Sequence, residues 1–415
     1  MSPLSWKRHL GAIAALLSVT AAAQPQPLPE RMYLNPGVLI GSSRMISLGG
    51  AYVSIAEGAD GISANPASIA HRTPHERGKW NVSPVATWMT NFGRHDFDND
   101  GNQDRLFYGV QFLGGLNVRV KNVGVGAFVR TNRLAFCDDL SPDCRLADRA
   151  SITFSQPNFS LGYAFFDESL IVAGGVNGLF TTLAHNLETW RYSGVGAEAG
   201  VLLRPRGLPF RVGLSGRTPM KASYRGGPDS VTVLGRQIYG AVVSPAVYSF
   251  GISFKAGEGA FSWNTLPDMA APTKARSLEA GQLVKSIFGN REDAKTGRLL
   301  LTLQLDIIGG IADAVPVGLF IRTPDAPTAA GAQLAYQPRI GAEYLVVPGR
   351  FRARLGGYHE PSPYPDRNGR THLTGGTELF LFRLFDDWSG TLTFDVAAFG
   401  GRHYQNIGVS IGTWR

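Results

Sequence analysis

Apolar residues alternate with small or polar residues over most of this chain. From about Lys79 onward, segments of 10 to 16 residues carry the pattern, as in Val123–Val129 and Leu299–Ile307. A period of two residues is typical of a β-strand rather than a helix. Strands of soluble β proteins usually have about 5 to 6 residues, whereas those of outer-membrane barrels span about 9 to 11, apolar outside and polar inside. The pattern therefore predicts an all-β fold, an antiparallel transmembrane β-barrel.

Turn signals divide this region into 14 segments, and an even number is expected of a single-chain barrel. The predicted strands are 80–90, 106–120, 123–134, 150–165, 169–182, 191–204, 209–225, 239–256, 298–311, 334–346, 350–359, 372–383, 390–401 and 404–414. Short connections such as Lys121-Asn122 alternate with long polar ones such as 91–105. Short periplasmic turns and long external loops are typical of such barrels.

One connection breaks this alternation. Residues 257–297 are long, yet they fall on the side of the short turns. Leu278–Phe288 could form a short amphipathic helix there. The sequence alone suggests no role for this connection.

The N-terminus predicts export. Basic residues at 7–9 precede the apolar run Leu10–Val19, and the small residues Thr20–Ala23 follow it. These are the three parts of a secretory signal peptide. We therefore expect a signal peptide at 1–23, an N-terminal plug or hatch at 24–78 and a transmembrane β-barrel at 79–415.

Cysteine content agrees with an exported protein. The chain contains two cysteines, Cys137 and Cys144, separated by a short polar run. A disulfide closing a small exposed loop is expected for such a pair in an oxidising compartment.

Composition and charge narrow the class of protein. Among 415 residues, 51 are glycine, 17% are charged and 44% are hydrophobic, which argues against a disordered chain. The net charge of +8 is accompanied by no basic cluster or nucleic-acid motif, so no nucleic-acid partner is expected.

Charges that include Arg130, Glu198 and Arg217 fall on the predicted inner face. Ion pairs within the lumen are the favoured interpretation of these charges, and a substrate site is the alternative.

The segment before the barrel does not alternate. It contains Ser43-Arg44, then Leu48-Gly49-Gly50-Ala51-Tyr52, Asp60 and Asn65-Pro66-Ala67. With Arg211–Pro219, Arg339–Tyr344 and Arg352–Tyr358, this run resembles the FadL-type family of long-chain fatty-acid and hydrocarbon transporters and the related PorV-like barrels. The resemblance implies a monomeric 14-stranded barrel closed by the N-terminal plug, and passage of hydrophobic molecules. It makes Arg44, Leu48, Gly49, Gly50, Tyr52, Asp60, Asn65, Pro66 and Ala67 the candidate ligand and plug residues.

The segment 150–165 shows a change of phase. Ile152 and Phe154 are apolar at even positions, whereas Phe159 and Leu161 are apolar at odd positions. Pro157 lies at the switch and lacks a backbone N–H, so a bulge or kink is expected there. FadL-type barrels release ligand through a kinked strand, and Pro157 is our candidate for a similar lateral opening. An ordinary bulge is the favoured alternative.

An acidic run predicts a metal site in an external loop. Asp96, Asp98 and Asp100 are followed by Gly101, Asn102 and Asp104, a spacing that matches the start of a calcium-binding loop. Phe107 stands where such a loop ends in glutamate, so a complete EF-hand is excluded. The alternative is a solvated acidic loop without an ion. No other cofactor is expected.

The sequence thus predicts an outer-membrane transporter for hydrophobic molecules, with long-chain fatty acids as the expected ligands. A PorV-like barrel that assists a secretion or surface-attachment machinery is the alternative. The expected surroundings are outer-membrane lipid, lipopolysaccharide and the outer-membrane assembly machinery of a Gram-negative-type bacterium. No catalytic constellation stands out in the sequence, so an enzyme is not expected.

Overall fold

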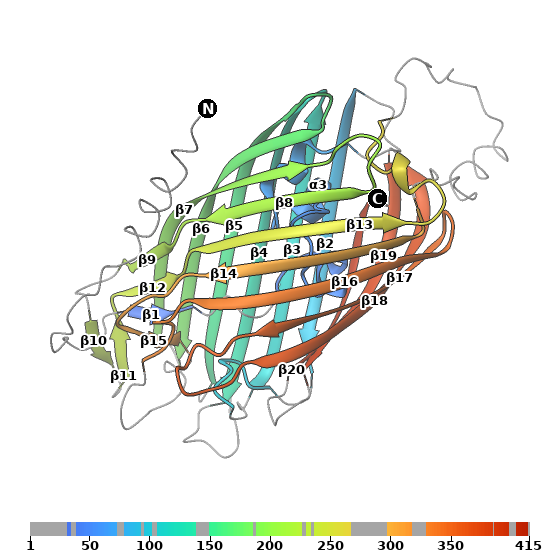
Figure 1. The fold of residues 1–415 in the computed structure, drawn as a ribbon. Helices are drawn as coiled ribbons and strands as arrows, with labels where there is room; N and C mark the ends of the chain where they lie inside the picture. The colour runs from blue at the N-terminus through green and yellow to red at the C-terminus, as the bar shows by residue number, and fades with distance from the viewer. Residues whose placement is uncertain are drawn as a thin grey trace, which may run out of the picture.

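The fold is a closed β-barrel with a short irregular segment inside it (Figure 1). The computed structural model describes residues 31–34, 39–72, 79–92, 95–101, 106–137, 149–185, 188–225, 230–233, 236–266, 297–317, 329–384, 386–397 and 404–413. Within these residues, no helix has the length and apolar character needed to cross a membrane.

The strands are β1 (Arg31–Tyr33), β2 (Trp80–Asn91), β3 (Leu106–Val120), β4 (Val123–Cys137), β5 (Arg149–Phe165), β6 (Leu170–His185), β7 (Glu188–Leu203), β8 (Phe210–Arg217), β9 (Met220–Tyr224), β10 (Ser230–Val233), β11 (Arg236–Tyr239), β12 (Ala241–Ser244), β13 (Val247–Ala256), β14 (Leu299–Ile308), β15 (Ala314–Pro316), β16 (Ala335–Val347), β17 (Phe351–Glu360), β18 (Arg370–Leu384), β19 (Asp386–Ala397) and β20 (Tyr404–Thr413). The helices are α2 (Ser43–Ser47), α3 (Gly58–Gly61), η1 (Pro66–Ala70) and η3 (Ala260–Ser262).

The predicted 14-stranded antiparallel barrel is confirmed. Sequential strands pair antiparallel, and the ring closes because β2 pairs with both β3 and β20. Two wall strands are interrupted: β8 and β9 lie on either side of Thr218-Pro219, and β12 and β13 on either side of Pro245-Ala246. Proline cannot donate a ladder hydrogen bond, which contributes to both breaks. The sequence prediction treated each pair as one continuous strand.

Alternation along the strands separates an apolar outer surface from a polar inner one. In β14, exposed Leu301, Leu303 and Leu305 alternate with buried residues such as Thr302 and Asp306. The exposed positions of the other wall strands are apolar in the same way. A closed sheet with a largely apolar outer face leaves no unpaired strand edge, as a bilayer requires, and exposed charges of the described strands, such as Arg133, Arg191 and Lys221, lie toward the loop end.

The two ends of the barrel differ. The short-turn end carries the turns at 121–122, 166–169, 204–209 and 348–350. The loop end carries the longer connections, except the one after β13, which leaves and returns at the short-turn end. Beside the loop end, β1 lies parallel between β12 and β15, with Arg31 in register with both Ala241 and Ala314.

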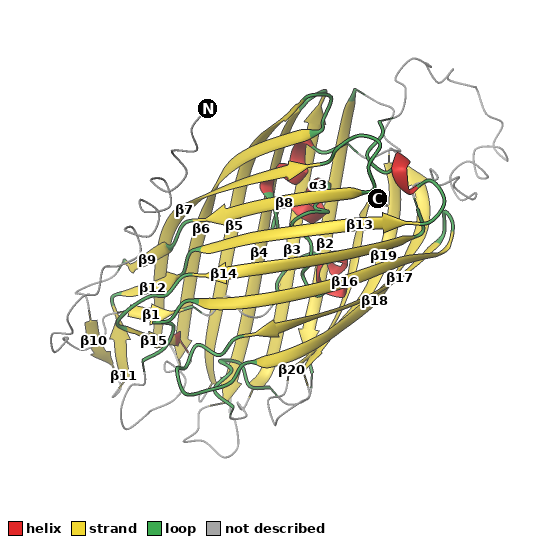
Figure 2. Cartoon of the chain, viewed as in Figure 1, coloured by secondary structure: helices red, strands yellow, loops and turns green. Residues whose placement is uncertain are grey.

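Residues 39–72, here called the inner segment, lie inside the ring of strands (Figure 2). The α2 helix contacts β17 to β19, and η1 contacts β3 to β7. α2 and η1 each begin at a capped residue, since Ser42 Oγ accepts from Met45 N and Asn65 Oδ1 accepts from Ala67 N. The Leu48-Gly49-Gly50 turn needs glycine because the φ angles of the two glycines are 64° and 73°.

Glycines of the wall bring the backbone of the inner segment into direct contact with the sheet. A Cβ atom on Gly213 would lie 2.2 Å from the carbonyl oxygen of Val53, and one on Gly124 would lie 2.2 Å from that of Ile69. These neighbours are backbone atoms, so no side-chain rotation could relieve the clash. Many of the inward-facing glycines therefore leave room for the backbone of the inner segment.

The predicted change of phase at Pro157 is wrong. Ile152 and Phe154 face the barrel interior and are buried, whereas Phe159 is exposed on the outer wall. The register between β5 and β6 is the same before and after Pro157, although pairing is interrupted at Gln156-Pro157 because proline lacks the N–H. No bulge forms, and a lateral opening at Pro157 stays a prediction.

Several sequence predictions fall outside the described residues. These are the signal peptide at 1–23, the plug boundaries at 24 and 78, the helix at Leu278–Phe288, and the disulfide, because Cys144 is not described while the backbone of Cys137 ends β4.

We expect Gly213→Val to displace the inner segment while the wall still forms, because the new side chain would overlap the Val53 carbonyl. Overpacking of this kind costs about 1–3 kcal/mol. Faster proteolysis of residues 39–72 in the purified barrel would measure the displacement. Gly174→Ala is the matched control, since a Cβ atom there would lie 3.7 Å from its nearest neighbour. Equal proteolysis of both variants would contradict the prediction.

Candidate functional site

An apolar pocket, here called the outer pocket, opens toward the loop end inside the barrel. Aliphatic, aromatic and proline side chains form most of its lining, including Tyr33, Leu34, Phe97, Phe154, Pro316, Val317 and Pro363. A larger cluster of inward-facing apolar side chains from β4 to β7 surrounds it, among them Leu134, Phe136, Ile152, Leu179 and Trp190. The lining of the outer pocket is therefore mainly apolar, with a few polar side chains among the apolar ones.

A second, polar pocket, here called the inner pocket, lies beside the inner segment. Its lining includes Leu39, Met45 and Pro66 of that segment, together with wall residues such as Gln304 and Asp306. Ile40, Arg130 and Arg217 line both pockets. The two pockets therefore meet at one aliphatic and two cationic side chains.

These two arginines lack carboxylate partners among the described residues. Arg130 Nε donates to the neutral amide oxygen of Gln156 at 2.5 Å. The Nε atom of Arg217 has no hydrogen-bond partner among the described residues. Glu198, its register partner on β7, instead accepts hydrogen bonds from the side chains of Asn158, Ser160 and Asn177 at 2.6, 3.1 and 2.6 Å. Glu198 attracts both guanidinium groups and Asp306 attracts Arg217, but neither carboxylate forms a direct ion pair with them. The apolar pocket thus ends at two cations that could each accept a further anionic partner.

Other inward charges are paired and hold the inner segment to the wall. Arg44 Nε lies 3.0 Å from Glu343 Oε2, and Arg44 NH1 lies 3.0 Å from Glu57 Oε2. Glu57 Oε1 also accepts from Arg211 of β8 at 2.7 Å, and Glu343 from Arg354 of β17 at 2.6 Å. For this group, the expected network of lumen ion pairs is present.

Most candidate residues taken from the family resemblance contact the wall rather than line the pockets. The Tyr52 and Val53 N–H groups donate to Gln304 Oε1 at 2.8 and 2.9 Å. Asn65 Nδ2 donates to the carbonyls of Val53 and Val201 at 2.9 and 3.0 Å. Leu48, Gly49, Gly50 and Ala67 pack against the inner face, and Asp60 Oδ1 lies near Gly412 of β20. Only Pro66 of this set lines a pocket.

The sequence did contain a signal for the outer pocket. Ile152 and Phe154 occupy positions where a barrel strand ordinarily carries polar residues, and the parity of the strand shows that they face inward. Sequence reasoning attributed them to a bulge. Apolar residues on the inner face of β5 near the loop end are better explained by an apolar lumen at that end of the barrel.

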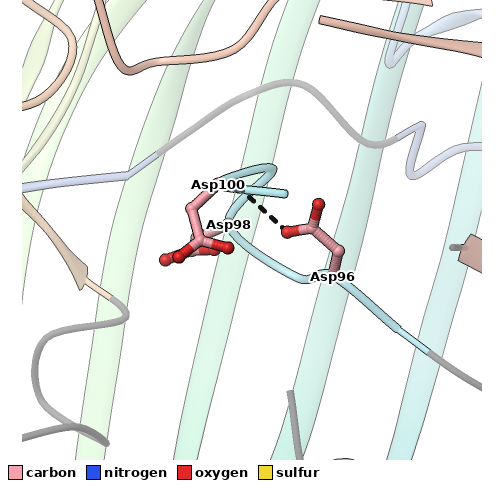
Figure 3. A group of neighbouring side chains, drawn as sticks. All are labelled: Asp96, Asp98 and Asp100. Carbon is pink, nitrogen blue, oxygen red and sulfur yellow. Dashed lines mark hydrogen bonds between the residues drawn. The ribbon is translucent and has the colours of Figure 1, made fainter. Parts of the chain in front are cut away.

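The acidic loop lies over the outer pocket. Carboxylate oxygens of Asp96, Asp98 and Asp100 all lie within 4.8 Å of one another (Figure 3). The Asp96 carboxylate also accepts from the N–H groups of Asp100 and Gly101 at 3.0 and 2.9 Å. Asn102 and Asp104 lie outside the described residues. Three of the five predicted calcium ligands are therefore close together, and calcium binding stays a prediction.

Contacts with the β17–β18 connection fix this loop in place. Tyr364 OH donates to Asp98 Oδ2 at 2.8 Å, and Asn99 Nδ2 donates to the Glu360 carbonyl at 3.2 Å. Arg370 donates to the Asp96 carbonyl and, at 2.7 Å, to Glu360 Oε2. The loop consequently places Phe97 and Asp98 in the wall of the outer pocket.

Comparison with solved structures finds barrels of the same fold. A Pseudomonas aeruginosa FadL homologue aligns over 91% of this chain and 98% of its own, with a TM-score of 0.58 and 11% identity. The CymD monoaromatic hydrocarbon channel aligns over 92% and 99%, with a TM-score of 0.55 and 11% identity. The Pseudomonas putida toluene transporter TodX aligns over 92% and 100%, with a TM-score of 0.52 and 11% identity.

The predicted resemblance to FadL-type barrels is thereby confirmed as a likeness of fold. No model of a known protein family matches the sequence, and no curated protein sequence matches it.

We expect Glu343→Gln to destabilise the folded barrel because it leaves Arg44 and Arg354 without their shared carboxylate. Removing one partner of a buried ion pair costs about 3–5 kcal/mol. Urea unfolding in detergent would measure the loss. Asp167→Asn is the control, since its pair with Arg206 is largely exposed and is worth within about 1 kcal/mol. Equal stability of the two variants would refute a structural role for Glu343.

Calcium binding to the acidic loop should depend on pH. Burial raises the pKa of the Asp96 carboxyl to about 6, and a calcium ligand must be ionised. Affinity is therefore expected to fall as the pH drops below about 6. Isothermal titration of the purified barrel with calcium would test this. Asp98→Asn should bind calcium more weakly because it removes one predicted ligand. Asp366→Asn, an exposed residue of the neighbouring connection, is the control. Absence of heat at pH 8 from a folded barrel would argue against the site.

Proposed function

We propose that this chain is an outer-membrane channel for hydrophobic molecules, and that long-chain fatty acids are its ligands. The observation that carries the proposal is the outer pocket itself, an apolar chamber that ends at Arg130 and Arg217. An acyl chain matches the apolar lining. A carboxylate matches two arginines that have no carboxylate partner among the described residues.

The proposed route follows the order of the two pockets. A ligand enters the outer pocket beneath the acidic loop and then passes Arg130 and Arg217 into the inner pocket. Because Leu39, Met45 and Pro66 line the inner pocket, the next step brings the ligand against the inner segment. A shift of residues 40–70 then opens the path, so that the inner segment acts as a plug.

The architecture supports an outer-membrane location. The outward side chains are apolar around the ring, and the wall strands are long enough to span a bilayer. In the proposed orientation, the short-turn end faces the periplasm and the loop end faces the outside, as is usual in these barrels. The structural neighbours are described as transporters or channels, which supports a non-enzymatic role.

Fatty-acid transport should depend on the arginine pair in a way that hydrocarbon transport does not. We expect Arg217→Gln and Arg130→Gln to slow uptake of labelled palmitate about 5- to 150-fold, because each loses a charged hydrogen bond worth about 1–3 kcal/mol. Uptake of a neutral hydrocarbon of similar length should change little. Arg367→Gln, in the exposed 361–369 connection, is the control for a general charge effect.

Two results would contradict the proposal at different levels. Equal slowing of palmitate and of the hydrocarbon would remove the carboxylate assignment but leave a hydrophobic channel. No uptake of either ligand by cells that contain the wild-type chain, together with a protein partner that co-purifies with it, would favour the PorV-like alternative.

A further inference from the structure

The connection after β13 turns back toward the lumen at the short-turn end of the barrel. Its base is closed by two backbone hydrogen bonds, from Arg298 N to the Ala256 carbonyl and from Gly297 N to the Glu258 carbonyl, both at 3.0 Å. Residues 260–264 then form η3 and the turn that follows it. This part of the connection is here called the return turn (residues 257–266).

Trp263 of the return turn is buried below the inner segment. Its side chain is only 3% exposed, although it belongs to a connection between strands. It packs in one apolar cluster with Tyr52 and Ile55 of the inner segment and Leu300 of β14. The neighbouring Phe261 is 65% exposed, so the turn directs one aromatic ring inward and one outward.

Arg211 joins the return turn to the inner segment. Its guanidinium carbon lies 3.9 Å from the centroid of the Trp263 ring, within the range of a cation–π contact. The same guanidinium donates to Asn264 Oδ1 at 2.8 Å and to Glu57 Oε1 at 2.7 Å. One buried arginine therefore holds both the return turn and the carboxylate that also binds Arg44.

Asn264 fastens the return turn to the adjacent wall. Its side-chain nitrogen lies 3.0, 2.9 and 2.9 Å from the carbonyl oxygens of Pro205, Leu208 and Phe210. Those carbonyls belong to the β7–β8 turn and the start of β8, so the anchor does not involve the inner segment. Loss of this side chain would release the return turn without removing Trp263.

Glycines stand at the start of the return turn and at the far end of the connection that contains it. Gly257, Gly259 and Gly297 have φ angles of 101°, 76° and 89°. These values lie in the left-handed region, where glycine moves with little steric restriction. The turn is therefore a compact element on a glycine hinge, fixed by two polar side chains and one ring.

We propose that the return turn is a latch that seals the short-turn end of the lumen and locks the inner segment through Arg211. When the latch is closed, the Trp263 ring fills the lumen beneath Tyr52 and Ile55, and Arg211 keeps Glu57 in place. When it swings out, the cation–π contact and the Asn264 anchor are lost together. The inner segment then loses one of its ties to the wall. The periplasmic placement of this latch rests on the proposed function, but the seal itself does not.

Ion conductance of the full-length protein in planar lipid bilayers tests the seal without any ligand. We expect Trp263→Ala to raise the open probability on the order of tenfold, since about 1.4 kcal/mol corresponds to tenfold in an equilibrium and a desolvated cation–π contact is worth about that much or more. Trp263→Phe keeps a ring over Arg211 and should restore most of the seal. Phe261→Ala, an exposed ring in the same turn, is the matched control and should conduct like the wild type.

Asn264→Ala gives an independent variant in case Trp263→Ala does not fold. It should raise conductance in the same direction because it removes the wall anchor. In a background with Cys137→Ser and Cys144→Ser, it should also speed maleimide labelling of Ala56→Cys, a fully buried position of the inner segment. Gel mobility before and after heating would show which variants form a folded barrel.

Wild-type conductance in folded Trp263→Ala and Asn264→Ala would overturn the proposal, because the inner segment alone would then seal the lumen. Raised conductance without faster labelling of Ala56→Cys would overturn the coupling to the inner segment. Neither readout uses fatty acid, so failure of the transport proposal would leave both results interpretable.

Discussion

Direct contact between the backbone of the inner segment and the glycines of the wall is the constraint on which this structure depends. A closed sheet of this width must be filled, and here it is filled by irregular chain rather than by side chains of the wall. Gly124 and Gly213 allow carbonyls of the inner segment to approach the sheet closely. Because the inner segment occupies the short-turn half, an apolar chamber remains at the loop end.

Charges inside the barrel serve two purposes that their sequence positions do not distinguish. Arg44, Arg211 and Arg354 each contact a carboxylate and hold the inner segment against the wall. Arg130 and Arg217 face the two pockets and have no such partner among the described residues. The three paired arginines contact or adjoin the inner segment, whereas Arg130 and Arg217 line the pockets beside it.

Local patterns predicted the fold well because the period of a strand directly sets which face each residue occupies. The alternation of Leu301 and Leu303 with Thr302 was enough to identify a barrel strand and its outer face. The site was harder to predict from the sequence, because the outer pocket combines residues from β1, β5 and β15 that no local pattern links. The bulge predicted from Ile152 and Phe154 was wrong for the same reason. Their apolar character is explained by their neighbours across the lumen rather than by their neighbours along the chain. The interruptions at Pro219 and Pro245 were missed although both prolines were visible in the sequence.

The position of β1 has a consequence for how the chain assembles. Arg31 pairs with Ala241 and with Ala314, so the first strand of the described residues requires two partners from the second half of the chain. The inner segment that follows must also be enclosed before β2 meets β20. Contacts this distant in sequence form slowly, because a long loop must close, at a cost in chain entropy, before the contacts can stabilise the fold. β1 and the inner segment, although synthesised before the barrel strands, are therefore expected to be among the last parts to reach their final place.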